Sequence, residues 1–92
     1  MELSNKRVSY SVLNSNEAVS LRGEVTISET GLISTFTGTF NDADGRYCGD
    51  FYCNEPESGI LNKNLSNIKL DKEVEASALL MNTVKMLKEE SN

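Results

Sequence analysis

The chain has 92 residues, of which 38% are hydrophobic and 25% charged, as expected for one globular domain with a modest core. Its formal net charge is −5 and its basic residues are dispersed, which argues against binding to nucleic acid or to an anionic membrane. It contains no histidine, which excludes Ser-His-Asp and Cys-His catalysis and removes the commonest metal ligand.

Residues 6–53 alternate apolar and polar side chains, the pattern of strands with one buried face. In the clearest run, 19–27, every odd position is apolar or glycine. Turn-forming residues at 29–31 and 41–45 separate the later runs. We therefore predict an α+β fold, in which a four-stranded antiparallel β-meander packs one face against a C-terminal α-helix (ββββα).

The alternation also predicts how the strands pair. With residues 29 and 30 as a two-residue loop, Gly23 lies opposite Phe36, and the next hairpin places Gly49 opposite Phe36 from the other side. A large side chain thus faces each glycine and fills the space beside it. The first hairpin is expected to place Val12 opposite Val19.

The two cysteines, Cys48 and Cys53, are predicted to lie on opposite faces of one strand. At about 3.3 Å per residue they are roughly 16 Å apart, too far for a disulfide. We expect Cys53 in the core and Cys48 on the polar face. Without a Cys-x-x-Cys pair, neither is expected to bind a metal.

Residues 54–70 are predicted to connect the sheet to the helix, and they are long enough to contain structure of their own. A short fifth strand and a helical turn near 65–70 both remain open. The helix is expected over 71–89, with Asp71 as its N-cap and lysines in its last turns.

Most apolar residues of the predicted helix fall on one broad face that suits the sheet. Leu79 and Met86 stand apart from this face, on an otherwise polar side. Either the sheet curls round the helix and covers them, or they contact another chain. The sequence leaves both interpretations open.

The candidates for acid–base chemistry are Asp42, Asp44 and Asp50, which a turn and a polar strand face explain more simply. In a calcium-loop frame the two aspartates of the turn fit, but Phe40 and Phe51 occupy the positions that require carboxylates. No phosphate-binding glycine motif is present. We therefore expect no enzyme activity, no metal and no cofactor.

Small size and absent catalytic groups favour a non-enzymatic interaction or regulatory module, with a homodimer or another protein as its partner. The open first and fourth strands are edges that could pair with another chain. The candidate contact residues are a polar sheet face and the helix pair: Arg22, Glu24, Thr35, Thr37, Asp50, Tyr52, Leu79 and Met86.

The alternative is a carrier that holds a small apolar ligand between sheet and helix. The inward glycines Gly23, Gly38 and Gly49 would open the space for it. In either case we expect a cytoplasmic location. The first five residues lack the basic start and the apolar stretch of a secretory signal, and no apolar run approaches the length of a membrane span.

Overall fold

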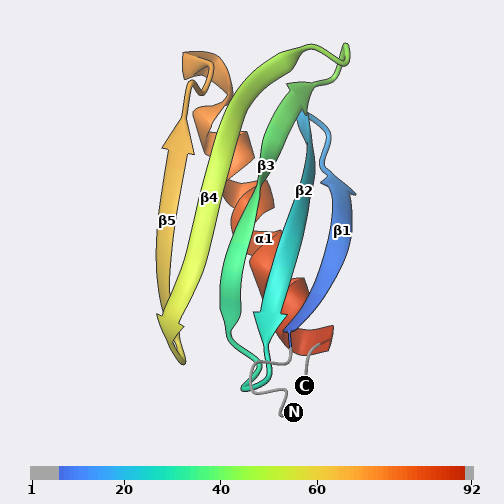
Figure 1. Cartoon of the computed structure of the whole chain (residues 1–92). Helices are drawn as coiled ribbons and strands as arrows, with labels where there is room; N and C mark the ends of the chain where they lie inside the picture. Colours follow the sequence, from blue (N-terminus) through green and yellow to red (C-terminus); the bar gives the residue numbers. More distant parts are fainter. Residues whose placement is uncertain (1–6, 91–92) are drawn as a thin grey trace.

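The computed structural model describes residues 7–90, which form one antiparallel sheet and one long helix (Figure 1). The strands are paired in the order β1-β2-β3-β4-β5, a simple meander. The predicted α+β fold is confirmed, with five strands in place of four. The elements are β1 (Arg7–Ser15), β2 (Val19–Ser28), β3 (Ile33–Asp42), β4 (Tyr47–Glu57), β5 (Ile60–Ser66), the short 3₁₀ helix η1 (Leu70–Lys72) and α1 (Glu73–Glu90).

The fifth strand, β5, forms from residues that were expected to connect the sheet to the helix. Leu61 and Leu65 pack against the core, and Lys63 between them lies opposite the core residue Cys53, on the concave face, although its side chain is exposed. Its Nζ donates a hydrogen bond to Ser77 Oγ on α1 at 3.1 Å. A lysine fits at such a position because its ammonium group can extend past the apolar layer. As a charged residue where the strand pattern requires an apolar one, it interrupts the alternation that would have indicated the strand.

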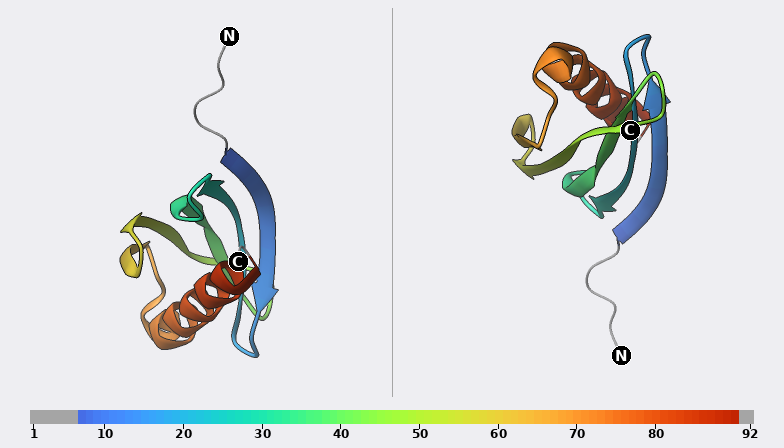
Figure 2. Two further views of the ribbon diagram at one scale, coloured as in Figure 1. Left: turned by 90° about the horizontal axis from the view of Figure 1, so that it is seen from below. Right: turned by 90° about the horizontal axis from the view of Figure 1, so that it is seen from above.

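The sheet curls around α1, which lies against its concave face (Figure 2). The helix crosses this face diagonally, from β5 at its start to β1 at its end (Figure 1). Lys63 of β5 bonds an early turn of the helix, whereas Asn14 Nδ2 of β1 donates to Thr83 Oγ1 in a late turn at 3.0 Å. The core lies between the two layers and contains Val19, Leu21, Val25, Ile27, Ile33, Phe36, Phe40, Cys48, Phe51, Cys53, Ala76, Leu79, Leu80 and Val84.

Gly23 and Gly38 lie directly opposite each other where strands β2 and β3 come close together. A Cβ on Gly38 would lie 2.1 Å from the carbonyl oxygen of Arg22, and one on Gly23 would lie 2.9 Å from the Phe51 ring. These positions therefore exclude any side chain, and the Phe51 ring fills the concave side. The glycines allow the backbones to approach and do not open a ligand space.

The strand pairing differs from the predicted register. The structure pairs Gly23 with Gly38 and Val12 with Gly23, whereas Phe40 lies opposite Gly49. Between β2 and β3 the turn contributes to this difference: Gly31 N donates to Ser28 O, Ser28 N donates to Leu32 O, and Gly31 has a φ of +84°. This is a three-residue hairpin loop with a glycine bulge, and a further irregularity between Thr26 and Ile27 shifts the remaining β2–β3 pairs. The pairings of β1 with β2 and of β3 with β4 depend on their own turns, at 16–18 and 43–46.

The predicted place of Cys48 is also wrong. It is buried in the core and not on the polar face, because the pairing of β3 and β4 shifts between Phe40 and Asn41. The irregularity turns Cys48 inward, while the neighbouring Tyr47 is exposed. Cys53 lies in the core as predicted, and both residues are free thiols.

The helix begins at Glu73, two residues later than expected, and Asp71 lies within η1 and does not serve as its N-cap. The buried face of α1 is rotated from the predicted one and includes Thr83. The hydroxyl of Thr83 donates to Leu79 O at 2.7 Å, so this polar side chain can be buried at little cost. The rotation brings Leu79 into the core and leaves Val74 exposed.

Candidate interaction surface

The meander leaves two edges, β1 and β5, because β5 covers the fourth strand that was expected to be an edge. Within residues 7–90 no strand pairs with the outer side of β1. In an antiparallel sheet, alternate residues of an edge strand direct their N–H and C=O groups away from the sheet. Such an edge is a template for another strand unless the protein protects it.

The β5 edge carries the usual protection. It is seven residues long, it contains Lys63, and its pairing with β4 is irregular between Asn54 and Glu57, next to Pro56. A lysine and a bulge are both devices that discourage pairing with another chain.

The β1 edge lacks these devices. It is nine residues long and pairs with β2 from Arg7↔Ser28 to Ser15↔Ser20 without a register shift. Residues 8–15 contain no charged residue, no proline and no glycine. A long and regular edge whose last eight residues are uncharged favours association with another strand.

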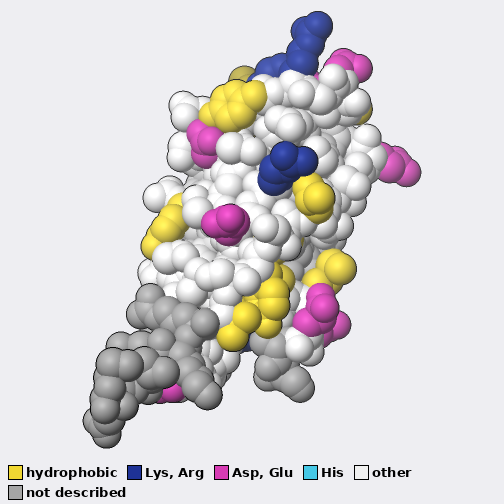
Figure 3. Space-filling view, turned by 45° about the vertical axis from the view of Figure 1, so that its right-hand side comes forward, with side chains coloured by type: hydrophobic (Ala, Val, Ile, Leu, Met, Phe, Trp, Pro, Cys, Tyr) yellow, Lys and Arg dark blue, Asp and Glu magenta, His cyan; other side chains and the backbone are white. Residues whose placement is uncertain are grey.

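Apolar side chains reach the surface on both faces of β1. Val8 is 50% exposed and Tyr10 53% exposed, and both lie on the concave face opposite Ile27 and Val25. Leu13 is 72% exposed on the convex face. Figure 3 shows this side of the molecule, where hydrophobic side chains form several patches between isolated charges.

A groove of about 360 Å³ runs between β1 and the last turns of α1. Its apolar lining includes Tyr10, Val12 and Met86. Asn14 Nδ2 donates to Thr83 Oγ1 at 3.0 Å and lies 3.7 Å from the Met86 sulfur, so its amide holds one end of the groove in place. The groove is continuous with the free edge of β1 and gives that edge an apolar pocket.

The predicted polar sheet face exists, on the convex side. The pairing places Arg22 and Asp50 on either side of Thr39, and Glu24 and Tyr52 on either side of Thr37. Thr35 lies opposite Thr26 on the same face. The structure therefore brings these six residues of three neighbouring strands together.

Within this face, Asp50 is held by local contacts. The Tyr47 hydroxyl donates to its Oδ2, and Asn67 Nδ2 donates to the same oxygen at 3.1 Å. These two hydrogen bonds lower the pKa of Asp50 and keep it ionised. The carboxylate thus orders the start of β4 and the loop after β5.

The helix pair does not form a common surface. Leu79 is 3% exposed and belongs to the core, so the interpretation in which the sheet covers it holds for this residue. Met86 is 50% exposed and lines the groove beside β1. Of the two, Met86 alone remains available to a partner.

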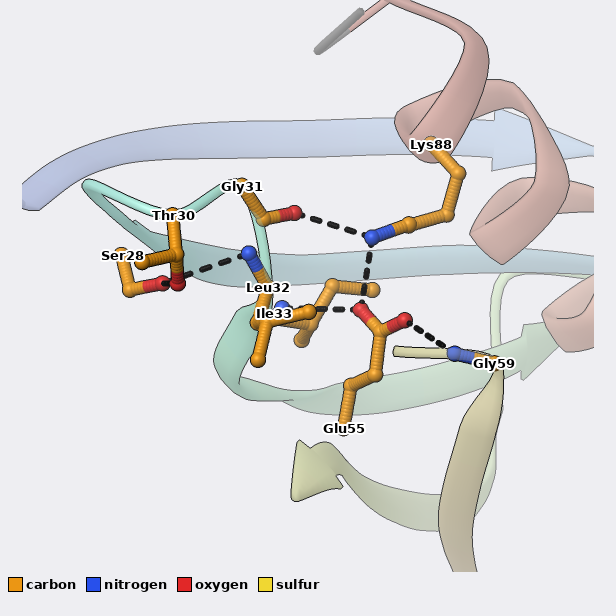
Figure 4. A network of polar contacts seen from close by, with 8 residues as sticks. All are labelled: Ser28, Thr30, Gly31, Leu32, Ile33, Glu55, Gly59 and Lys88. Carbon is orange, nitrogen blue, oxygen red and sulfur yellow. Dashed lines mark hydrogen bonds and ion pairs between the residues drawn. The ribbon is translucent and has the colours of Figure 1, made fainter. Parts of the chain in front are cut away.

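Glu55 is a buried charged residue, 8% exposed, and it joins three parts of the chain (Figure 4). Its Oε1 accepts hydrogen bonds from Lys88 Nζ at 2.7 Å and from Ile33 N at 3.1 Å, and its Oε2 accepts one from Gly59 N at 3.1 Å. Lys88 Nζ also donates to Gly31 O at 2.9 Å. The network fastens the end of α1 to two hairpin turns.

Burial by itself raises the pKa of Glu55, but the hydrogen bonds from Lys88, Gly59 and Ile33 together lower it by more than burial raises it, so the net shift is downward. The carboxylate is therefore ionised and fully occupied by donors, which suits a structural role and not proton transfer. Burial also raises the pKa of both cysteines, that of Cys53 to about 11, so neither is an activated nucleophile.

Among residues 7–90, no group of three or more Cys, Asp or Glu side chains is arranged to hold a metal ion. No helix in this part of the chain is long and apolar enough to cross a membrane. No family model, curated protein or solved structure matches the chain. Its function is therefore inferred from its own residues, among which the β1 edge is the clearest candidate site.

Proposed function

We propose that the protein is a small non-enzymatic interaction module that binds an extended protein segment along the free edge of β1. The observation that carries this proposal is the contrast between the two edges. The β5 edge has a lysine and an irregular pairing, whereas β1 is long, regular and without charge from residue 8 to residue 15. Strand addition is a common way in which proteins recognise extended segments.

Both affinity and specificity have a source at this edge. Each main-chain hydrogen bond between the strands contributes about 0.5–1.5 kcal/mol net, and several can form along nine residues. The added strand also places every second side chain on the concave face. There it meets Val8 and Tyr10 and the groove beside Met86, which selects apolar side chains at alternate positions.

A carrier of a small apolar ligand receives less support from the same geometry. The inward glycines that were expected to open a cavity are closed by neighbouring atoms, with Phe51 beside Gly23 and Ile68 beside Gly49. The groove beside β1 is within the size range of ligand sites, at about 360 Å³. Because it is continuous with the unpaired edge, it suits a side chain of an added strand better than an isolated ligand.

The acidic net charge of −5 favours a protein partner over nucleic acid or an anionic membrane. The two buried free thiols are compatible with the reducing cytoplasm, where we place the protein as part of this proposal.

Site-specific photo-crosslinking in native cell lysate tests the proposal. A photoreactive phenylalanine analogue replaces Leu13 on β1 or, as the matched control, Ile60 on β5, which is also exposed. We expect a discrete cross-linked product from position 13 and none from position 60. Products from position 60 alone, or equal products from both positions, would show that the β1 edge is not the binding surface.

A further inference from the structure

Residues 8–12 of β1 read Val-Ser-Tyr-Ser-Val, the same sequence in both directions. An antiparallel pair of identical strands related by a two-fold axis places residue i opposite residue j, and j opposite i. With the axis through Tyr10, Val8 lies opposite Val12 and Ser9 opposite Ser11. Every residue of this segment then faces a residue of its own kind.

From this symmetry and from the unprotected edge we infer that the strand bound by β1 is β1 of a second copy of this chain. The inference rests on the proposed function and names its partner. The two five-stranded sheets would join into one sheet of ten strands, with the two-fold axis at Tyr10.

The side-chain faces agree with this register. Val8, Tyr10 and Val12 lie on the concave face, opposite Ile27, Val25 and Gly23 of β2. Pairing about Tyr10 creates a continuous apolar row on this face, with the two tyrosines at its centre. On the convex face the serines lie opposite each other, and their hydroxyl groups can exchange hydrogen bonds.

The register with its axis through Ser11 fits less well. Opposite residues of an antiparallel sheet share a face, so the axis must pass through a residue and not between two. An axis through Ser11 would place the apolar Val8 opposite Asn14 and the polar Ser9 opposite Leu13. The axis through Tyr10 avoids both mismatches.

Charge and shape also favour a second copy. Residues 8–15 contain no charged side chain, so self-pairing brings no like charges together at the strand. Val8 of the second copy would lie next to Val12, which lines the groove together with Met86 and Leu87. Half-exposed Val8 and Tyr10 would thereby become less exposed to water.

The mass of the purified protein in solution tests the inference, by sedimentation equilibrium at concentrations up to about 100 μM, in the range that populates micromolar complexes. We expect twice the chain mass of 10.1 kDa. A protein that stays at one chain mass throughout overturns the second copy as partner. The proposed function would then be decided separately, by whether position 13 forms a cross-link to another protein.

Charged variants test the register. In the double variant Ser9→Lys with Ser11→Lys, each new lysine faces a lysine of the second copy, and we expect the dissociation constant to rise by at least about tenfold. The double variant Ser9→Glu with Ser11→Glu should weaken in the same way. An equimolar mixture of the two should restore a dimer, because each pair then has opposite charges.

The matched control places the same two charges on the convex face of the other edge, as Asn62→Lys with Asn64→Lys, and should remain a dimer. Circular dichroism of each variant shows whether its fold is retained. A dimer that persists in both β1 variants, or a mixture that fails to re-associate although both variants are folded, overturns the pairing about Tyr10.

Discussion

Removal of the Glu55 carboxylate is expected to be among the most destabilising single changes at a polar residue. The side chain is 6% exposed, and its oxygens accept from Lys88 Nζ, Ile33 N and Gly59 N. In the variant Glu55→Ala all three donors lose this carboxylate at once, although Lys88 Nζ keeps its hydrogen bond to Gly31 O. Breaking a buried ion pair by removal of one partner costs about 3–5 kcal/mol.

The lower end of this range applies, because Lys88 is 30% exposed and its ammonium group can be rehydrated. The buried Ile33 amide cannot, and one unsatisfied buried donor accounts for about 1–3 kcal/mol. We therefore expect a loss of about 3 kcal/mol, which lowers the melting temperature of a domain of this size by about 12–24 °C. Glu55→Gln retains one oxygen acceptor and should lose about 1–2 kcal/mol.

Urea unfolding followed by circular dichroism measures these losses. The control is Glu57→Ala, which removes an exposed carboxylate from the same strand and should change the free energy of unfolding by less than about 0.5 kcal/mol. If Glu55→Ala loses no more than Glu57→Ala, the network does not stabilise the fold and its assigned role is refuted.

Three further results are expected. Because the folded-state pKa of Glu55 lies below its ordinary value of 4.5, its contribution to stability is complete above that pH and is lost as the pH falls below it. Between pH 5 and 2.5, the range in which carboxyl groups titrate, the free energy of unfolding should therefore change less steeply with pH in Glu55→Gln. Gly38→Ala should lower the free energy of unfolding by about 1–3 kcal/mol in the same urea assay, because its Cβ would lie 2.1 Å from Arg22 O. An unchanged midpoint would show that β2 and β3 can separate there. The thiol reagent DTNB should leave Cys48 and Cys53 unmodified in the native protein and label both in denaturant, and rapid native labelling would contradict their burial.

The buried face of β2 and most of that of β3 could be predicted from the sequence, but the strand pairing and the place of Cys48 could not. Alternation of apolar residues decides which side chains are buried, and it correctly assigned Leu21, Val25 and Phe36 to the core. Pairing depends on the turn, and Gly31 forms a bulge that adds one residue to the expected loop. A short loop and a bulged loop are both compatible with the sequence at that turn.

The candidate site was less accessible from the sequence. Which strand is an edge depends on whether residues 54–70 contain β5, and Lys63 concealed that strand. The symmetry of residues 8–12 is visible in the sequence, but it acquires a meaning only because no other strand of residues 7–90 pairs with the outer side of β1. Similarly, Glu55 and Lys88 are 33 positions apart, and no local pattern indicates that they meet.

The position of α1 in the chain has a consequence for biosynthesis. The ribosome completes all five strands before the 18 residues of the helix, which take about 1–4 s more at ordinary rates of synthesis. The meander joins neighbours along the chain and can therefore form early. Until the helix emerges, the nascent sheet presents Phe36, Phe40 and Phe51 to water next to an unprotected strand edge. During that interval the nascent chain can bind chaperones or aggregate, and the interval ends when the helix docks on the sheet.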